Sequence, residues 1–587
     1  MKLPSPTFLV QSFFGVLRRF PFVMLAAAAG VFAAMALIHG VKHDLEDIYL
    51  KIMLTAALGL PLFLSARIAV EKWRLGRLWQ WLLPAVVAMQ LAGFYLMMGQ
   101  FDVSGDEAVA MKFLGLNFVA HLMVAFLPYL GDTPVADFWE YNKRLFGTFV
   151  MGALYSLVIY AGLSVAILAI DNLFNAGIDD KIYGQLFVFI AGIFNTGFFL
   201  SNFPKEYQGL ANGESSYTTV IKNLTKFILI PIVGIYFLIL YAYSAKILMT
   251  WELPQGWVSS LVLGFSVAGI FTYLLNYLLR HYDDSALVSG YRRWFFFVLL
   301  PMVALLFVGI GRRISDYGVT EERYFVAAAG VWLLLLGLYF IFSKKDNIKF
   351  IPISLAIFAL LAVIGPVSAF RISGNSQVSR LKAMLEKHEM LAGGIIVATT
   401  DTLGNDEVDN IRSAFHYLRT RGHFRQLRPL LENPPDTLFP SRGEMNRLLD
   451  GLGLQAVKGK DGFCDFNFPA MENIEIADYR YFWKISSYRL KGAAGNYTGW
   501  KISKDGIGLE FVRNGEIQDF FNLQDFLRNM EKEYGCHPSE PIDSADAVLE
   551  LQGKTMAVKI VFEHVYVEQK ENLELRNLSG LVFLKEQ

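Results

Sequence analysis

The chain has 587 residues and a mass of 66.1 kDa; it is 54% hydrophobic and 18% charged, with a formal net charge of +0. Soluble domains are about one-quarter charged, so this composition excludes a wholly soluble enzyme, a disordered protein and a nucleic-acid-binding protein. The charge is uneven: residues 1–370 carry 26 Lys/Arg and 22 Asp/Glu, and the shorter segment 371–587 carries 27 and 31. We therefore expect two domains in two different solvents, residues 1–370 and residues 371–587.

Long apolar stretches dominate the first domain. The hydrocarbon core of a bilayer is about 30 Å thick and takes roughly 20 apolar residues of helix to cross. A helix also satisfies its own backbone hydrogen bonds, which hydrocarbon cannot do. Eleven stretches meet these demands and are predicted to be transmembrane helices: Phe20–Ile38, Ile48–Ala66, Trp79–Met98, Met111–Tyr129, Phe146–Ile170, Ile182–Leu200, Phe227–Leu248, Trp257–Leu279, Trp294–Ile310, Tyr324–Phe342 and Phe350–Phe370.

The first stretch follows Arg18 and Arg19 and contains Ala34-Met35-Ala36, as a cleaved signal peptide can. Its apolar run is long, and the amphipathic segment Phe8–Leu17 precedes it. Both features favour a retained helix, which keeps the number of predicted spans at eleven.

The distribution of Lys and Arg among the loops predicts the orientation. With the N-terminus in the cytoplasm, the inner loops hold 18 of these residues and the outer side holds 8, as the positive-inside rule requires. An odd number of spans then places residues 371–587 outside the cytoplasm. Both cysteines, Cys464 and Cys536, lie in that region. A disulfide between them is allowed in such a compartment, and two free thiols are the simpler alternative.

The second domain is predicted to be α+β. Three helices are expected first, at Ser379–Leu391, Asp406–Leu431 and Arg442–Leu452. Strands begin near Tyr481, and the dipeptides Asp505-Gly506 and Asn514-Gly515 are typical of tight hairpin turns. A helix at Leu523–Tyr534 and a second hairpin, formed by Ala547–Leu551 and Met556–Val567, complete the domain.

Common catalytic motifs are missing from the sequence. The sequence contains no Gly-x-Ser-x-Gly, His-Glu-x-x-His or Cys-x-x-Cys motif, and Gly553-Lys554-Thr555 lacks the upstream glycine of a phosphate loop. His416 and His423 are close in sequence but have no third ligand, which is not typical of a metal site. A non-enzyme without a cofactor or a metal is therefore the favoured interpretation.

Polar residues inside the predicted spans suggest two different roles. Asp, Glu, Lys and Arg are absent from the middle of the spans, although ion-coupled transporters usually keep such a group there. Uncharged polar residues do occur within the spans, namely Gln90, Asn117, His121, Asn195 and Asn276. Hydrogen bonding between helices is the simpler interpretation, and a polar path for a substrate is the alternative.

The loop Gly311–Arg323 lies on the outer side by count, yet it is rich in arginine. Thr320 is expected to cap the tenth span, with Glu321 and Glu322 at the positive end of its dipole. This capping does not need the basic residues of the loop. Arg312, Arg313 and Arg323, with Lys246, are therefore predicted to bind either the acidic second domain or an anionic group such as a lipid phosphate. A second basic segment, residues 412–428, is expected to present a solvated face, and contact with anionic lipid near the membrane surface is the alternative.

Three segments resemble a bacterial family of multi-pass membrane proteins: Lys226–Trp257, Tyr291–Arg323 and Gly365–Leu381. This family is catalogued as a domain of unknown function with the number four-one-five-three. The element Tyr317-Gly318-x-Thr320-x-x-Arg323 is specific in company with the other segments and weak alone. The resemblance implies a protein of the bacterial cytoplasmic membrane, and it implies no reaction, ligand or catalytic residue.

Two functional hypotheses remain open from the sequence. The first is a non-enzymatic envelope scaffold or sensor of the inner membrane, whose periplasmic α+β domain binds an envelope-protein partner or an anionic ligand. The second is a permease or lipid-handling transporter that uses the polar path. Both place the helical bundle in the lipid bilayer.

Overall fold

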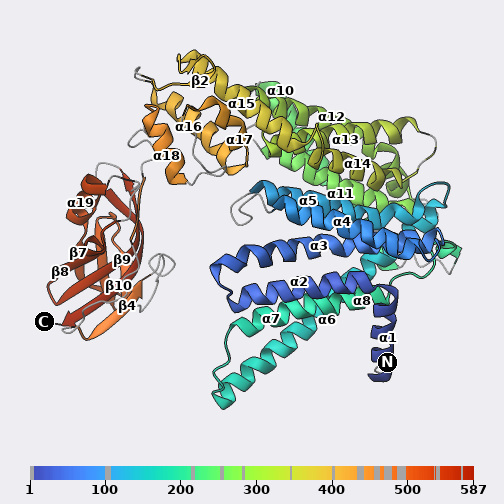
Figure 1. The fold of residues 1–587 in the computed structure, drawn as a ribbon, viewed down its shortest axis with the longest axis horizontal. Helices are drawn as coiled ribbons and strands as arrows, with labels where there is room; N and C mark the ends of the chain where they lie inside the picture. Colours follow the sequence, from blue (N-terminus) through green and yellow to red (C-terminus); the bar gives the residue numbers. More distant parts are fainter. Residues whose placement is uncertain are drawn as a thin grey trace. The chain divides into compact units, whose positions relative to one another are not determined.

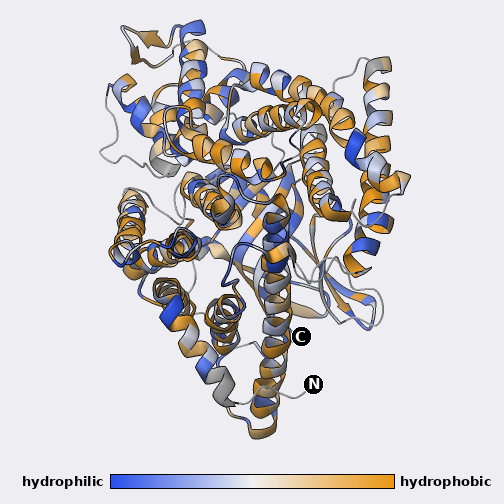
Figure 2. Ribbon diagram, turned by 90° about the vertical axis from the view of Figure 1, so that its right-hand side faces the viewer, coloured by the Kyte–Doolittle hydropathy of each residue, from blue (hydrophilic) through white to orange (hydrophobic). Residues whose placement is uncertain are grey.

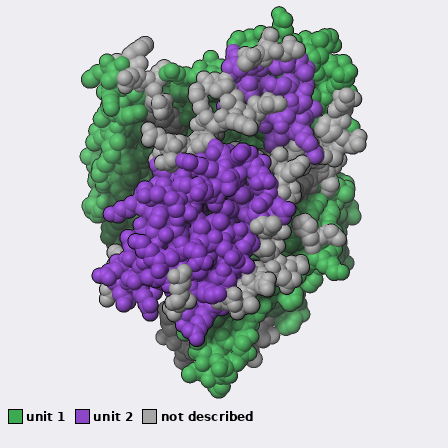
Figure 3. Space-filling model, turned by 90° about the vertical axis from the view of Figure 1, so that its left-hand side faces the viewer, with its two compact units in different colours: residues 1–397, 414–439 green, residues 398–413, 440–587 purple. Residues whose placement is uncertain are grey.

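The structure is a computed structural model of the chain (Figure 1). It describes residues 6–98, 107–212, 219–250, 257–279, 285–343, 345, 347–399, 403–432, 442–454, 463–468, 479–485, 498–534, 536, 542–569 and 573–586. These residues divide into two compact units (Figure 3). The first unit contains residues 1–397 and 414–439, and the second contains residues 398–413 and 440–587. The domain boundary predicted from the sequence, at residue 370, concerns a different property, namely where the chain leaves the bilayer. That boundary stays a prediction.

The first unit is a bundle of long apolar helices, which confirms the predicted membrane architecture. Within the described ranges, ten helices are long and apolar enough to cross a bilayer. Several of them are extended by short helical or π-helical turns. The segments are α2 (Pro21–His39), α3 (His43–Lys72), α4 (Trp79–Met98), α5 (Glu107–Phe126), α6 (Val135–Phe174), α7–η2–α8 (Lys181–Phe189, Ile190–Phe194, Asn195–Ser201), α9–η4–α10 (Thr219–Asn223, Leu224–Leu229, Ile230–Thr250), α11 (Trp257–Leu279), α12 (Ala286–Tyr317) and α13 (Glu321–Phe342).

The eleventh predicted span is shorter than expected. The helix α14 (Phe350–Val363) has 14 residues and therefore a length of about 21 Å, less than the thickness of a bilayer core. The chain then turns through Gly365, which has a positive φ of 98°, and continues as α15 (Ala369–Lys387). The hydroxyl of Tyr324 at the start of α13 donates to Val367 O. This hydrogen bond shows that the chain just after α14 lies beside the start of α13.

Contacts between distant segments distinguish the two ends of the bundle. At one end, Arg19 donates to Phe203 O and Lys349 Nζ donates to Gly131 O. We call this the α1 end, because α1 (Pro6–Arg19) also lies there and leaves the direction of α2 at Phe20 (Figure 1). Since α14 starts beside Lys349 and α13 runs antiparallel to it, Glu321 and Val363 lie at the opposite end. We call that the α15 end.

Burial within the bundle follows the expectation for helices in lipid. Aromatic rings such as Tyr273, Phe296 and Phe340 pack in its core, with the rings of Phe296 and Phe340 stacked at 4.7 Å. By contrast, the apolar window of α6 is unburied, and Leu157 and Val158 are each 62% exposed. Hydrophobic residues, coloured orange in Figure 2, occupy most of the length of these helices. Such a surface needs lipid around it.

After α15, a short hairpin (β1, Leu391–Ala392; β2, Ile395–Ile396) leads to α16 (Asn405–Thr420). The predicted helix Asp406–Leu431 is broken at Gly422, whose φ of 69° is a left-handed conformation that glycine adopts readily. The chain continues as the short helix α17 (Phe424–Leu427). The residues from Ala414 onward in α16, together with α17, belong to the first unit.

The second unit contains the first part of α16, then α18 (Arg442–Gly451) and two antiparallel sheets. One has the order β3-β9-β10-β4 with β8 paired to β9, and the other has the order β5-β6-β7. The turns at Asp505-Gly506 and Asn514-Gly515 join the strands of the second sheet, where they were predicted. The elements are β3 (Phe463–Asn467), β4 (Tyr481–Ile485), β5 (Gly499–Ile502), β6 (Gly508–Arg513), β7 (Glu516–Asn522), α19 (Gln524–Tyr534), β8 (Val548–Gln552), β9 (Met556–Gln569) and β10 (Leu573–Glu586).

The two sheets and α19 enclose one hydrophobic core, which contains Phe466, Trp500, Phe521 and Phe562. The long strand β10 was not predicted, although it pairs with β9 along its whole length. The helical bundle followed by an α+β region nevertheless confirms the predicted fold class.

Candidate functional site

A buried polar site of the bundle surrounds Glu321 at the α15 end. The turn between α12 and α13 contains Gly318, whose φ is 74°. Thr320 then caps α13 by accepting a hydrogen bond from Arg323 N at 3.4 Å. Glu321 is the first residue of α13 and is 0% exposed. A buried carboxylate is costly unless charges and hydrogen-bond donors compensate it, so its partners determine how this end of the bundle is held together.

The first partners come from α15, which lies against the α12–α13 turn. Ser373 Oγ donates to Glu321 Oε1 at 2.7 Å. Gln377 Nε2 donates to the backbone oxygens of Tyr317 and Val319, both at 3.0 Å. Ser376 Oγ accepts from Val319 N at 3.0 Å. Side chains of α15 thus satisfy the free backbone groups of the turn and one oxygen of the carboxylate.

The remaining partners come from α16 and the turn after it. The hydroxyl of Tyr417 donates to Glu321 Oε2 at 2.5 Å, and His423 Nε2 lies 3.3 Å from Glu321 Oε1. Burial raises the pKa of Tyr417, and the hydrogen bond to Glu321 raises it further. The hydroxyl therefore remains a neutral donor at physiological pH. The five residues Glu321, Ser373, Tyr417, Arg421 and His423 are called the Glu321 cluster below.

Arg421 supplies the positive charge of the cluster. Its Nη2 atom lies 2.8 Å from Glu107 in α5 and 3.2 Å from Glu322, and its Nε atom lies 4.0 Å from Glu321. The arginine side chain is only 11% exposed, whereas those of Glu107 and Glu322 are 66% and 69% exposed. The guanidinium thus connects the turn after α16 to two helices of the bundle, α5 and α13, from a largely buried position.

Close packing completes the site at Gly374. A Cβ atom added there would lie 2.7 Å from the Cε1 and Nδ1 atoms of His423. The position therefore requires glycine if the imidazole is to stay beside Glu321. Sequence reasoning missed Ser373, Tyr417 and His423 as partners of Glu321, because they are 52, 96 and 102 residues away. The available signal was that Glu321 and Ser373 both lie in segments that carry the family resemblance.

The arginines predicted to bind an anion have different surroundings. Arg323 Nη1 donates to Tyr317 O and Gly318 O, so it caps the end of α12. Arg312 is paired with Asp316 at 3.7 Å, with both side chains about half exposed. Arg313 is exposed and close enough to Arg323 for their charges to repel. Lys246 is exposed on α10, and no contact among the described residues joins it to these arginines.

The five polar residues of the predicted path are distributed over the bundle. Gln90 and His121 are exposed, and Asn117 and Asn195 are partly buried. Asn276 is buried and donates to Val288 O at 3.0 Å, as an interhelical hydrogen bond would. His121 Nδ1 lies 2.8 Å from Asn117 O within α5. Within the described ranges, no hydrogen bond joins the side chains of these five residues to one another.

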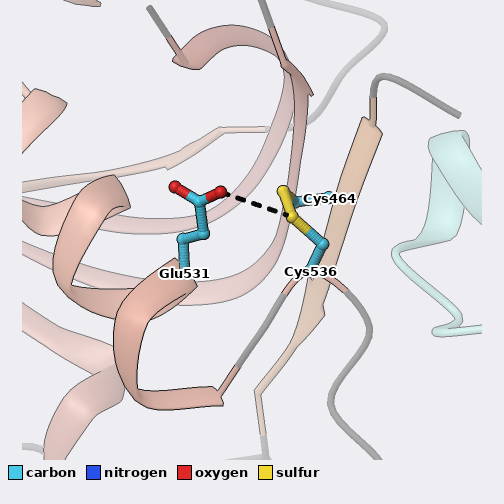
Figure 4. The surroundings of a disulfide bond; sticks show 3 residues. All are labelled: Cys464, Glu531 and Cys536. Carbon is cyan, nitrogen blue, oxygen red and sulfur yellow. Dashed lines mark hydrogen bonds between the residues drawn. A yellow bond between two sulfur atoms is a disulfide. The ribbon is translucent and has the colours of Figure 1, made fainter. Parts of the chain in front are cut away.

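The two cysteines of the second unit are joined to each other. Cys464 in β3 and Cys536 after α19 form a disulfide between residues 72 apart in the chain (Figure 4). Glu531 Oε1 lies 3.9 Å from Cys536 Sγ. These three residues are of metal-ligand types and lie close together. Because both sulfur atoms are used in the disulfide, they do not form a metal site in this state.

The turn Gly553-Lys554-Thr555 joins β8 to β9 and surrounds a carboxylate of the chain itself. The two oxygens of Asp519 accept hydrogen bonds from the backbone N–H groups of Lys554, Thr555 and Met556. Burial acts to raise the pKa of Asp519, but these hydrogen bonds outweigh it and hold the pKa below its ordinary value. A Cβ at Gly553 would lie 2.6 Å from Asp519 Oδ2, so the turn has no room for a phosphate.

Comparisons with known proteins confirm the family resemblance and give no activity. The family described as "Domain of unknown function (DUF4153)" matches residues 25–411. The uncharacterized protein PM1469 of Pasteurella multocida (strain Pm70) is 25% identical over 307 residues, which cover 47% of this chain and 51% of that protein. The chain thus matches about half the length of this curated relative. No solved structure matches the chain.

Proposed function

The chain belongs to the family described as Domain of unknown function (DUF4153), whose description contains no activity, and we propose that it is a non-enzymatic scaffold or sensor of the bacterial inner membrane. In this proposal the helical bundle anchors the α+β unit on the periplasmic side. There the α+β unit binds an envelope-protein partner or an anionic ligand.

The observation that carries the proposal is the Glu321 cluster. Side chains from α15, from α16 and from the turn after α16, which all follow the last membrane helix, bond to one fully buried carboxylate of the bundle. Removing one partner from a buried ion pair costs about 3–5 kcal/mol. The Glu321 cluster is thus a joint between the bundle and the segments that follow α14. Such a joint suits a protein that must hold its extramembrane part in place, or that must transmit a conformational change from the extramembrane part to the bundle.

Two further features support the periplasmic placement. The inner loops of the proposed topology hold the larger share of Lys and Arg. The disulfide between Cys464 and Cys536 is suited to an oxidising compartment. The outer-face residues Arg312, Arg313, Arg323 and Lys246 remain candidates for an anionic ligand, although Arg323 already bonds the end of α12.

The alternative is a permease or lipid-handling transporter. Its support is the set of polar side chains in the bundle, of which Asn195 has a buried Oδ1 atom without a partner among the described residues. The two π-helical turns, Ile190–Phe194 and Leu224–Leu229, also interrupt membrane helices, and such turns are frequent at functional sites. Among the described residues, no contact connects these polar side chains and π-helical turns into a continuous path.

Complementation of a deletion strain separates the two functions. The readout is survival under envelope stress, with membrane levels of each variant checked by immunoblotting. A scaffold predicts that the joint variant Ser373→Ala/Tyr417→Phe loses complementation, because two of the hydrogen bonds to Glu321 are lost. It predicts that the path variant Asn117→Leu/His121→Leu complements like the wild type.

A matched control for the joint variant is Tyr317→Phe, which removes an exposed hydroxyl at the same turn. This control should complement fully. Loss of complementation by the path variant, with retention by the joint variant, would contradict the scaffold and favour the transporter.

A further inference from the structure

A cavity of about 180 Å³ lies at the α1 end of the bundle, where α1 meets α2 and where α3 ends and α4 begins. Its polar lining includes Arg18, Arg67 and Gln80, and its apolar lining includes Phe22, Phe63 and Trp81. These residues lie near the ends of membrane-spanning helices. The cavity is therefore placed at the level where lipid headgroups meet acyl chains.

The apolar side of the cavity is an aromatic wall. The rings of Phe22 and Phe63 stack at 5.7 Å, and the ring of Trp81 meets Phe22 edge-on at 5.9 Å. Trp81 is 68% exposed although its ring belongs to this wall. An exposed tryptophan at the end of a span is typical of the interfacial zone of a membrane.

The polar side carries an excess of positive charge. Arg19 is fully engaged, because it bonds both oxygens of Glu71 and the backbone oxygens of Phe203 and Pro204. Arg67 shares the same carboxylate at 2.9 Å. Arg18 is exposed and has no partner among the residues that the structure describes. The cavity lining thus carries three arginines, two of which share the carboxylate of Glu71, and this leaves a local surplus of two positive charges.

The start of α2 adds to this preference for an anion. Pro21 and Phe22 form its first turn and line the cavity. The first N–H groups of a helix have no acceptor within the helix, and the helix dipole is positive there. A negative group in the cavity would therefore meet two arginines and a positive helix end.

We propose that this cavity binds the phosphate of an anionic phospholipid from the leaflet at the α1 end. Arg18 and Arg67 contact the phosphate, and the aromatic wall contacts the glycerol and the first methylene groups. The volume is below the roughly 300–1,000 Å³ of pockets that enclose drug-sized ligands, so the acyl chains remain in the bilayer. The proposal is independent of the Glu321 cluster and of the scaffold function.

Native mass spectrometry of the full-length protein tests this site. The detergent-solubilised protein is mixed with equal amounts of phosphatidylglycerol and phosphatidylcholine, and the bound lipids are counted. We expect phosphatidylglycerol to be preferred. Arg18→Gln should weaken its binding about fivefold, the order expected for one basic residue near an anionic membrane surface. The matched control Arg77→Gln changes an exposed arginine that does not line the cavity, and it should bind like the wild type.

A second pair of variants tests the aromatic wall. Trp81→Ala should reduce phosphatidylglycerol binding, whereas Trp79→Ala, in the same turn of α4 but outside the cavity, should not. Unchanged thermal unfolding without added lipid shows that each variant is folded. Equal binding of the two lipids, or equal losses in Arg18→Gln and Arg77→Gln, would overturn the proposal. Complete displacement of phosphatidylglycerol by millimolar glycerol 3-phosphate would identify a free phosphate ester as the ligand and would also overturn it.

Discussion

Replacing Tyr417 by phenylalanine removes one hydroxyl from the Glu321 cluster and leaves the aromatic ring in place. In the wild type this hydroxyl donates to Glu321 Oε2 at 2.5 Å. Ser373 and His423 bond the other oxygen, Oε1. Among the described residues, the variant therefore leaves Oε2 of a fully buried carboxylate next to the more distant Arg421 Nε atom, 4.0 Å away.

The magnitude follows from the charge on the acceptor. A hydrogen bond to a charged group contributes about 1.5–3 kcal/mol to stability. Because 1.4 kcal/mol corresponds to a factor of ten, the equilibrium for opening α16 away from the bundle should increase about 10- to 150-fold. The 150-fold increase applies if water cannot reach Glu321 Oε2 after the hydroxyl is removed.

Hydrogen exchange followed by mass spectrometry measures this opening directly. In the full-length protein we expect the amides of residues 414–427 to exchange at least about tenfold faster in Tyr417→Phe than in the wild type. Strand β9 in the second unit should be unaffected. Tyr317→Phe serves as the control, because its hydroxyl is exposed. Equal exchange of residues 414–427 in Tyr417→Phe and Tyr317→Phe would refute the reasoning that Glu321 holds α16.

Three further predictions concern other contacts. The pKa of Asp519 is held below its ordinary value, so its stabilising contribution is present above the unfolded-state pKa and is lost as the pH falls through the folded-state pKa. Hydrogen exchange of β8 and β9 between pH 6 and pH 3 measures this loss, and pH-independent stability there would contradict it. Replacing Cys464 and Cys536 by serine should destabilise the second unit by up to about 4 kcal/mol, as expected for a loop of 72 residues; unchanged unfolding in urea would be inconsistent with a stabilising disulfide. Gly374→Ala should destabilise the bundle by about 1–3 kcal/mol through overpacking, whereas Gly311→Ala, with open space around its Cβ, should be neutral or stabilising; similar melting temperatures for the two variants would argue against the close contact at Gly374.

The membrane helices were predictable from composition because hydrocarbon imposes one simple demand on every span. The exception is α14, which ends at Val363 and not at Phe370. The apolar count continued through Gly365 and Pro366, but the positive φ of Gly365 ends the helix there. A window of hydropathy does not detect such a turn.

Glu321 illustrates why the candidate site was only partly predictable. The sequence indicated an acidic residue in the first turn of a helix, which is favourable for the helix dipole. Its burial depends on Ser373, Tyr417 and His423, which are brought to it from α15, α16 and the turn after α16 by the tertiary structure. Local pattern does not contain that information. Arg323 bonds Tyr317 O and Gly318 O in the turn beside it, and its predicted role in binding an anionic group stays a prediction.

The β-rich part shows the same division between local and distant information. Asp505-Gly506 and Asn514-Gly515 identified their hairpins because glycine and asparagine adopt the positive φ of such turns. Strand β10 has no comparable dipeptide at its start within the described residues, and its pairing with β9 extends over 13 residue pairs. Its assignment therefore required the tertiary structure.

The most direct test of the scaffold proposal is the side of the membrane on which the second unit lies. Glu516→Cys places a thiol at the exposed start of β7, and Lys345→Cys places one in the exposed connection between α13 and α14 at the α1 end. A membrane-impermeant maleimide applied to intact spheroplasts should label Glu516→Cys at once and label Lys345→Cys only after permeabilisation. Labelling of Lys345→Cys in intact spheroplasts, with Glu516→Cys protected, would contradict the account.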